Sequence, residues 1–397
     1  MNSVSNRMRR LSPPMTFAMN QLSNDLKAQG IDVVNMSLGE PDFDTPEHIK
    51  DAAISAIHHN FSHYTPVAGL LSVKKAIAAK LQKENKLDYQ ADEILVSNGA
   101  KQSICNVIMA LVDQGDEVIV PAPYWVSYPQ MVLLAGGNPV YIETNMEQGF
   151  KMSPEQLEKA ITPQTKLIIL CSPSNPTGAV YSQNELEALT KVITQHEGLF
   201  VLSDEIYEHL NYVGNHASIA TCDGMRERTI IVNGVSKAYA MTGWRIGFIA
   251  APQWIISACN LLQGQYTSGP CAVSQKAAEE AWEGSQECVE TMRQAFKRRR
   301  DLLVDMIRAI PGLEVSAPEG AFYLFPKCSA YFGKTDGNRV IKSSTDFSLY
   351  LLEVGHVATV CGDAFGAPDY FRLSYATSEE RITEAAKRIA KALASLK

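Results

Sequence analysis

The middle of the chain repeats a short, apolar, β-branched run followed by a polar loop, and this pattern constrains the fold most. The runs span residues 118–120, 166–171, 199–202 and 229–233, and amphipathic segments such as 183–194 separate them. Apolar runs that alternate with helical segments are typical of strands in a mostly parallel sheet covered by helices. The sequence therefore predicts an α/β domain.

A polar loop follows each of these predicted strands. The loops span residues 121–124, 172–176, 203–205 and 234–237. In open parallel sheets, ligands bind beyond the carboxyl ends of the strands. We therefore expect the four loops to share one rim and to hold the functional site.

The C-terminal third has a different pattern. A helical tract at 274–310 precedes four short apolar runs, at 313–316, 321–325, 357–360 and 371–375, and a closing helix at 378–396. Ser378 followed by two glutamates is typical of a helix start, and Ile382, Ala385, Ile389 and Leu393 then form one apolar stripe. This order predicts a smaller α+β domain.

Composition excludes several classes of protein. Hydrophobic residues make up 46% of the chain, the net charge is −7 and no long basic run occurs, so neither a disordered chain nor a nucleic-acid partner is expected. No apolar run approaches the roughly 18 residues of a membrane span, and Pro13 and Pro14 interrupt the only candidate for a signal-peptide core. The eight cysteines contain no C-x-x-C pair, which favours reduced thiols and a cytoplasmic location without a membrane partner.

Common cofactor and metal motifs are missing. The chain contains neither G-x-G-x-x-G nor G-x-x-x-x-G-K-[ST], so a dinucleotide-binding or P-loop function is disfavoured. His59 and His63 are four residues apart, but Asn60 stands where a zinc protease has its glutamate. The other histidines are scattered, and we expect no metal.

Residues 233–247 carry the most informative stretch. A lysine in a turn usually lies on the surface, but Lys237 follows a predicted strand and a small Gly-x-Ser turn, eight residues before Arg245. A lysine with a lowered pKa forms Schiff bases with carbonyl compounds, and Ser236 and Arg245 could bind a phosphate. Together these residues point to pyridoxal 5′-phosphate.

This cofactor also requires an acid beside its pyridine nitrogen, which keeps the ring an electron sink. Asp204 follows a predicted strand, where an aspartate is often just a turn or cap residue, but its combination with Lys237 makes it the candidate. Tyr207 and Asn175 could both hydrogen-bond the ring hydroxyl oxygen.

With these residues the chain resembles the class I pyridoxal phosphate-dependent aminotransferases of fold type I, close to the bacterial aspartate aminotransferases. The resemblance covers nearly the whole chain through residues 39–46, 174–178, 203–207, 234–247 and 371–375. It implies a large cofactor-binding domain at 46–285 with a mostly parallel seven-stranded sheet, and a small domain formed by 1–45 and 286–397. It also implies a homodimer with active sites at the subunit interface.

The resemblance further implies that Lys237 forms the Schiff base and moves the α-proton of the substrate. The implied cofactor-binding residues are Gly99, Ala100, Lys101, Trp125, Asn175, Asp204, Tyr207, Ser236, Lys237, Arg245 and, from the partner subunit, Tyr64. The implied substrate-binding residues are Gly39, Trp125, Asn175, Arg372, Lys101 and Thr16. Taken alone, Trp125 could instead be a core aromatic, and Arg372 could pair with a structural acid as readily as with a ligand carboxylate.

The expected reaction is the transfer of an amino group from an L-amino acid, aspartate foremost, to 2-oxoglutarate by a ping-pong mechanism. Lys101 and Thr16 are the candidates for the side-chain carboxylate, although acid-specific relatives have Ser-x-Thr where this chain has Pro14-Met15-Thr16. Some relatives that transaminate prephenate have a basic residue where this chain has Ser12, so prephenate ranks lower. The alternatives are an aromatic or prephenate aminotransferase and a carbon–sulfur lyase on the same fold.

Overall fold

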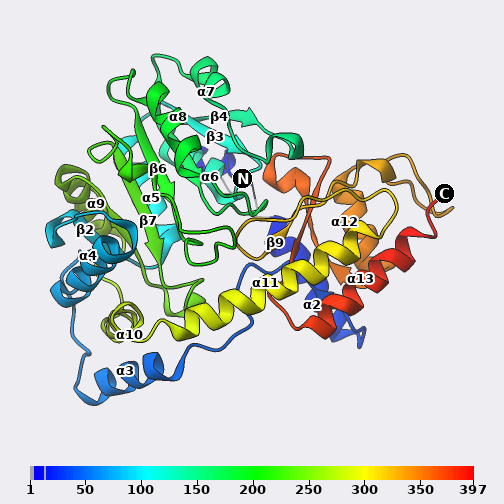
Figure 1. Cartoon of the computed structure of the whole chain (residues 1–397), viewed down its shortest axis with the longest axis horizontal. Coiled ribbons are helices and arrows are strands. Elements are labelled where there is room, and N and C mark those ends of the chain that lie inside the picture. The colour runs from blue at the N-terminus through cyan, green and yellow to red at the C-terminus, as the bar shows by residue number, and fades with distance from the viewer. Residues whose placement is uncertain (1–3, 13–14) are drawn as a thin grey trace.

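The computed structural model describes residues 4–12 and 15–397, and Figure 1 shows two groups of elements placed side by side. The long helix α11 (Glu287–Arg308) runs from one group to the other in both views. The first group is built on a large sheet. The second contains the C-terminus and the N-terminal segment that begins at α2 (Met15–Ala28), whereas the short helix α1 (Asn6–Arg9) contacts the first group.

The large sheet has seven strands in the order β2-β8-β7-β6-β5-β3-β4. Only β8 runs antiparallel to its neighbours, β2 and β7, so the expected mostly parallel seven-stranded sheet is confirmed. The strands are β2 (Ile94–Ser97), β3 (Glu117–Ala122), β4 (Asn138–Glu143), β5 (Thr165–Cys171), β6 (Phe200–Asp204), β7 (Thr229–Gly234) and β8 (Gly247–Ala250).

Helices cover both faces of this sheet because alternate residues of each strand point to opposite sides. In β5, Leu167 and Ile169 pack against the helices of one face, while Ile168 and Leu170 pack against those of the other. The first face carries α5 (Ala100–Leu111), α6 (Ser127–Ala135) and α9 (Gln253–Tyr266). The second carries α4 (Leu71–Asn85), α7 (Pro154–Ala160), α8 (Gln183–Ile193) and α10 (Ala272–Glu283), with α3 (Glu47–His58) against α10.

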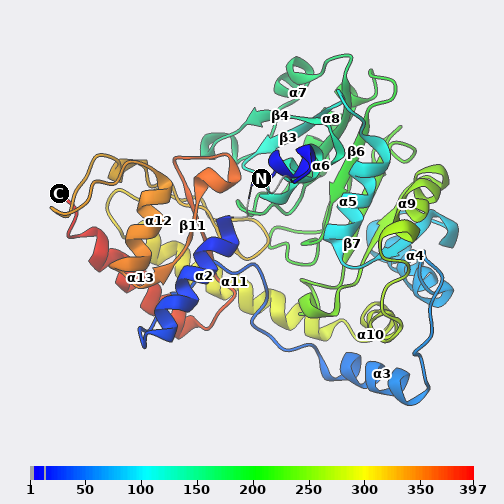
Figure 2. The ribbon, with the colours of Figure 1, turned by 180° about the vertical axis from the view of Figure 1, so that it is seen from behind.

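The second group of elements combines the N-terminal and C-terminal parts of the chain. Its sheets have the orders β11-β12-β9 and β1-β10. The strands are β1 (Val34–Asn35), β9 (Tyr323–Leu324), β10 (Val357–Ala358), β11 (Val360–Cys361) and β12 (Phe371–Ser374). The helices are α2 (Met15–Ala28), α12 (Ser344–Glu353) and α13 (Glu379–Leu393), and Figure 2 shows α2 beside them.

Short 3-10 helices complete the described elements. They are η1 (Ala91–Glu93), η2 (Met146–Gln148), η3 (Ile219–Thr221), η4 (Thr242–Trp244), η5 (Ser329–Tyr331) and η6 (Gly362–Phe365).

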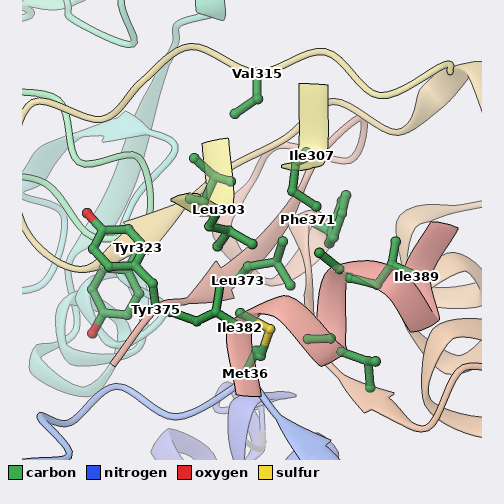
Figure 3. Close-up of a cluster of buried hydrophobic side chains, with 14 of the residues drawn as sticks. Met36, Leu303, Ile307, Val315, Tyr323, Phe371, Leu373, Tyr375, Ile382 and Ile389 are labelled. Atoms are coloured by element: carbon green, nitrogen blue, oxygen red, sulfur yellow. The ribbon is translucent and has the colours of Figure 1, made fainter. Parts of the chain in front are cut away.

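The core of the second group is an apolar cluster drawn from distant segments (Figure 3). Met36 comes from the N-terminal segment, Leu303 from α11, Phe371 from β12 and Ile389 from α13. The stripe expected for the closing helix is confirmed, because Ile382, Ala385, Ile389 and Leu393 are all buried in this cluster. Ser378 caps α13 by accepting a hydrogen bond from the backbone N–H of Arg381.

Three expected elements differ in the structure. The run at 313–316 forms no strand but a single bridge between Glu314 and Lys327. The tract at 274–310 is two helices, separated at Gly284, where a Cβ would lie 2.7 Å from the carbonyl oxygen of Glu280. The run at 357–360 is divided between two sheets, since β10 pairs with β1 and β11 pairs with β12.

The domain limits at 46 and 285 stay a prediction. Within the described residues, no helix is both long and apolar enough to cross a membrane.

We predict that truncating Leu303 destabilises the chain far more than truncating an exposed leucine. Leu303→Ala removes a fully buried side chain from the cluster of Figure 3 and is expected to lower the free energy of unfolding by about 2–5 kcal/mol. The control is Leu22→Ala on α2, where the leucine is 43% exposed. Urea denaturation measures both changes, and equal losses would contradict this description of the core.

Candidate active site

The loops after β5, β6 and β7 meet the N-terminus of α5 and strand β12 around one cavity of about 350 Å³. Eleven of the predicted site residues line it: Gly39, Ala100, Lys101, Trp125, Asn175, Asp204, Tyr207, Ser236, Lys237, Arg245 and Arg372. Three of the four expected loops therefore share one rim, whereas loop 121–124 does not line the cavity and only Trp125, just after it, does. The rim closes into a cavity because β12 and the segment around Gly39 approach from the second group of elements.

Lys237 lies inside this cavity, just after β7. Its Nζ donates a hydrogen bond to the backbone oxygen of Gly39 at 2.6 Å. Burial lowers the pKa of Lys237 to about 8, and the positive charges of Arg245 and Arg372 also lower it, while Glu40 and Asp204 oppose the shift. A substantial fraction of this lysine is therefore a neutral, nucleophilic amine in mildly alkaline solution.

Asp204 ends β6 and points into the same cavity. Its Oδ2 accepts a hydrogen bond from the Tyr128 hydroxyl at 2.6 Å, and its Oδ1 accepts one from the backbone N–H of Ile206 at 3.3 Å. Burial raises the pKa of Asp204 to about 6. The carboxyl group is thus held in place by two donors and is poised to pair with a cationic ring nitrogen.

Arg372, on β12, is 3% exposed and stacks between two aromatic rings. Its guanidinium carbon lies 4.4 Å from the ring centre of Tyr323 and 5.0 Å from that of Phe365. One terminal nitrogen donates to Asn175 Oδ1 at 2.9 Å, and the other donates to the Ser37 carbonyl at 2.7 Å.

These partners of Arg372 are neutral. Among the described residues no acid forms an ion pair with it, and its Nε is buried without a hydrogen-bond partner. Burial lowers the pKa of Arg372, the direction expected of a cation without a counter-ion. The sequence left two partners open for Arg372, a structural acid or a ligand carboxylate. Because no such acid lies beside it in the described residues, the ligand carboxylate is the alternative that fits.

An anion cradle lies at the start of α5. The first amide groups of a helix have no intrahelical acceptor and attract anions, and Ala100 and Ser236 line the cavity there. Arg245 is held beside them by hydrogen bonds from its terminal nitrogens to Thr242 O at 2.9 Å and Asn98 O at 3.2 Å. Gly99 has φ +84°, and a Cβ on it would lie 2.4 Å from Arg245 Nη2. A glycine is therefore needed to keep this cradle open.

Aromatic residues line the space between the cradle and Asp204. The Trp125 ring faces Tyr128 edge-on at 5.3 Å, and Lys101 Nζ lies 5.0 Å from the Trp125 ring centre. The Tyr207 hydroxyl is 2.8 Å from that of Tyr323. An anion cradle, a neutral-prone lysine, an aromatic wall and a buried acid in one cavity fit pyridoxal 5′-phosphate, whose phosphate, carbonyl, ring and ring nitrogen need these four groups.

Three predicted residues do not line the cavity. Gly99 lies just behind it, as the residue that precedes α5. Tyr64 is fully exposed and does not line the cavity of a single chain. Thr16 falls in α2, but its side chain is outside the described residues. Cys361 is buried in β11 and does not line the cavity.

Sequence reasoning missed several lining residues. Tyr128, which holds Asp204, lies in the first turn of α6, three residues after Trp125, which precedes the helix. The close spacing of two aromatic residues after a predicted strand is the signal that could have found it. Tyr323, which touches both Tyr207 and Arg372, lies in a two-residue strand far along the chain and gave no local signal. The other missed residues are Ser37, Leu38, Ile104, Cys171, Ile206 and Thr242.

Comparison with known proteins adds independent findings. Residues 31–389 match the family of class I and II aminotransferases. The chain is 48% identical to a probable aspartate/prephenate aminotransferase of Rickettsia bellii, over all of both chains. It is 46% identical to the aspartate/prephenate aminotransferase of Nitrosomonas europaea, over 98% of this chain and 99% of that one.

Two solved structures are similar over nearly the full length. The aspartate aminotransferase of Rhizobium meliloti superposes with a TM-score of 0.97 at 44% identity, covering 100% of each chain. The aspartate aminotransferase of Thermus thermophilus with maleate superposes with a TM-score of 0.93 at 43% identity, covering 99% of this chain and 100% of that one.

We predict that Lys237 titrates near pH 8. In the cofactor-free protein, its rate of reaction with an amine-specific reagent should rise as the pH passes about 8 and then level off, because the ammonium form does not react. Exposed lysines of the same chain should titrate near about 10.4. Peptide mass spectrometry after timed labelling measures both, and a Lys237 midpoint equal to that of the exposed lysines would contradict its burial.

We predict that Gly99→Ala weakens binding of pyridoxal phosphate at least about tenfold, because the added methyl displaces Arg245 from the cradle. Gly30→Ala is the matched control, since Gly30 also has φ +84° but has no atom within 4 Å of the added carbon. Equilibrium dialysis of the two variants gives the dissociation constants. Equal weakening by both substitutions would show that backbone strain, not the cradle, is responsible.

Proposed function

The chain belongs to the class I and II aminotransferases, and from that premise we propose that it transfers the amino group of L-aspartate to 2-oxoglutarate by a ping-pong mechanism. It is a pyridoxal phosphate-dependent aminotransferase of fold type I. The observation that carries the choice of substrate is Arg372, a buried cation that lacks an acidic partner among the described residues and faces a cavity shared with Lys101.

When bound, the cofactor supplies a carbonyl group that condenses with amines and a ring that withdraws electrons from the substrate α-carbon. Lys237 is the amine that takes and returns the α-proton, since its pKa of about 8 leaves a substantial fraction neutral in mildly alkaline solution. Asp204, oriented by Tyr128, would place a negative charge at the ring nitrogen. Asn175 and Tyr207 would hydrogen-bond the ring hydroxyl oxygen, and Ser236, Arg245 and the α5 amides would hold the phosphate.

The substrate is held by its carboxylates. Arg372 offers the α-carboxylate a guanidinium that is already fixed by Asn175 and by Ser37, so little side-chain entropy is lost on binding. Lys101 offers a second cation to the distal carboxylate. Burial and the nearby charge of Arg245 lower the pKa of Lys101, and an anion beside it would oppose that shift.

Two cations at separate points of one cavity favour a dicarboxylic amino acid over a monocarboxylic one. The Thermus thermophilus relative, which is similar over nearly its whole length, has a structure with maleate, a dicarboxylate. This supports a dicarboxylate pocket here. Both half-reactions use the same pocket, because aspartate and 2-oxoglutarate each carry an α-carboxylate and a distal carboxylate.

Prephenate is the second candidate substrate, as the keto acid that accepts the amino group. A neighbouring cavity of about 760 Å³ shares Lys101 and Arg245 with the first and gives room for a larger dicarboxylate. Relatives in Rickettsia bellii and Nitrosomonas europaea carry the name aspartate/prephenate aminotransferase. Ser12 lines this neighbouring cavity, so a basic residue in its place would face the same space, and its absence here keeps prephenate second.

The homodimer is part of the same proposal. Tyr64 is fully exposed, and Ile54, Ile57 and Phe61 nearby in the chain are also exposed, which is unusual for large apolar side chains so close together. A second copy of the chain covering these side chains would bring Tyr64 to the wall of that copy's active-site cavity. The cytoplasmic location stays a prediction.

We predict that Lys101→Met raises the KM for aspartate about 10- to 100-fold, because a charge-assisted hydrogen bond to a carboxylate contributes about 1.5–3 kcal/mol. The KM for alanine, which has no distal carboxylate, should change by less than about threefold. The matched control is Lys166→Met, which removes a lysine that lies 5.7 Å from the Phe200 ring, outside the cavity.

Steady-state assays with 2-oxoglutarate measure these constants. Equal effects on aspartate and alanine would refute the role of Lys101. Release of ammonia and pyruvate from cystathionine, without transfer to the keto acid, would instead favour a carbon–sulfur lyase.

A further inference from the structure

A buried ion pair lies directly behind the loops that carry Asp204 and Lys237. Lys80, on α4, contacts Glu208, and their side chains are 2% and 4% exposed. Neither residue lines the active-site cavity, and the chemistry described above uses neither. Burying two charges is costly, so such a pair is weak evidence for stability and calls for another explanation.

The carboxylate of Glu208 connects its own loop, after β6, to helix α4 and to strand β7. Its Oε1 accepts hydrogen bonds from Lys80 and, at 2.7 Å, from the side-chain amide of Asn233 at the end of β7. Its Oε2 accepts a hydrogen bond at 2.8 Å from Asn85, the last residue of α4. The amide of Asn233 is itself oriented, because its Oδ1 accepts the backbone N–H of Gly234 at 2.7 Å.

The position of this carboxylate in the chain gives the contact its meaning. Glu208 follows Asp204 by four residues and is adjacent to Tyr207, while Asn233 precedes Lys237 by four residues. Strands β6 and β7 pair as far as Asp204 and Val232, and Glu205 N donates to Val232 O at 2.9 Å just beyond. In the described part of the chain, the Glu208–Asn233 hydrogen bond then ties the loop after β6 to the end of strand β7, just before the Lys237 loop, where the β6–β7 backbone ladder has ended.

Charged groups on both sides keep Glu208 ionised. Burial alone would raise its pKa, but the charges of Lys80, His209 and His216 outweigh burial and hold the pKa well below its usual value. Glu84 lies on the outer side and contacts Lys80 and His209, and Glu205 lies on the inner side and contacts His216. The carboxylate is therefore a permanent acceptor for Asn233 across the working pH range.

We propose that Glu208 is a positioning residue: through Asn233 it fixes the loop of Lys237 relative to the loop of Asp204 and Tyr207. This inference rests on the roles proposed above for Asp204 and Lys237. The cofactor touches both loops, so a small relative shift would misplace the lysine amine against the α-carbon of the substrate. Lys80 acts one step further back, because it holds the carboxylate in place and balances its charge.

Two double variants separate positioning from general stability. Both replace the lysine by methionine, so neither leaves a lone buried charge. Lys80→Met/Glu208→Gln keeps a side-chain carbonyl oxygen that can accept from Asn233. Lys80→Met/Glu208→Leu has the same net charge and similar volume but has no acceptor.

The double variant Lys80→Met/Glu208→Leu is expected to lower kcat about 10- to 100-fold, which is the loss typical of a displacement of about 1 Å at the reacting atoms. Its KM for aspartate should change less than about threefold. The pH midpoint of the visible absorbance of the Lys237-bound cofactor should also move, because the amine and the acid change their spacing. The glutamine pair should stay near the parent in both measurements. Equal kcat values and equal midpoints in the two pairs, whatever their melting temperatures, would overturn the proposal.

Further variants keep the outcome readable. If either double variant fails to fold, Asn233→Leu keeps the ion pair but removes the bond, and it should reproduce the loss of kcat and the shifted midpoint; parent values would overturn the proposal. Lys237→Ala tests the premise separately. If borohydride still attaches the cofactor covalently to that variant as it does to the parent, the role of Lys237 fails, whereas a parent that does not use aspartate refutes the donor and leaves the absorbance test of Glu208 intact.

Discussion

The cations of the cavity form no ion pair with an acid in the part of the chain that the structure describes, and this is the constraint around which the cavity is built. Arg372 is buried between two aromatic rings and bonded to neutral oxygens, and Lys237 is buried enough to lower its pKa to about 8. Arg245 is held by two carbonyl oxygens. Buried cations destabilise the cavity when no anion is bound, and binding of phosphate and carboxylates stabilises it. The unpaired cations therefore define its ligands.

The fold supplies this arrangement through strand ends. Parallel strands β5, β6 and β7 deliver the loops of Asn175, Asp204 and Lys237 to one edge of the large sheet. Arg372 arrives from β12 in the other group of elements, and the Ser37–Gly39 segment contacts both Arg372 and Lys237. The site therefore depends on how the two groups pack, and the cluster of Figure 3 sets the position of β12.

Much of the large sheet and its rim could be predicted from the sequence. Strands buried on both faces appear as continuous apolar runs, and the polar loops after them hold Asp204 and Lys237. The short strands of the second group were harder, since β9 has two residues and 313–316 forms a single bridge. Tyr323 and the Glu208–Asn233 bond depend on contacts between distant segments, so no local pattern indicates them. Tyr64 is exposed in the single chain, and its role depends on a second copy.

The most direct test of the unpaired-cation account is an absorbance titration of the purified protein with its cofactor bound. Aspartate should convert the visible band of the Lys237-bound cofactor to that of the aminated form, and 2-oxoglutarate should then restore it. Alanine and tyrosine should require much higher concentrations, because each lacks a distal carboxylate for Lys101. A protein that converts with tyrosine but not with aspartate, or that shows no visible band, would contradict the account.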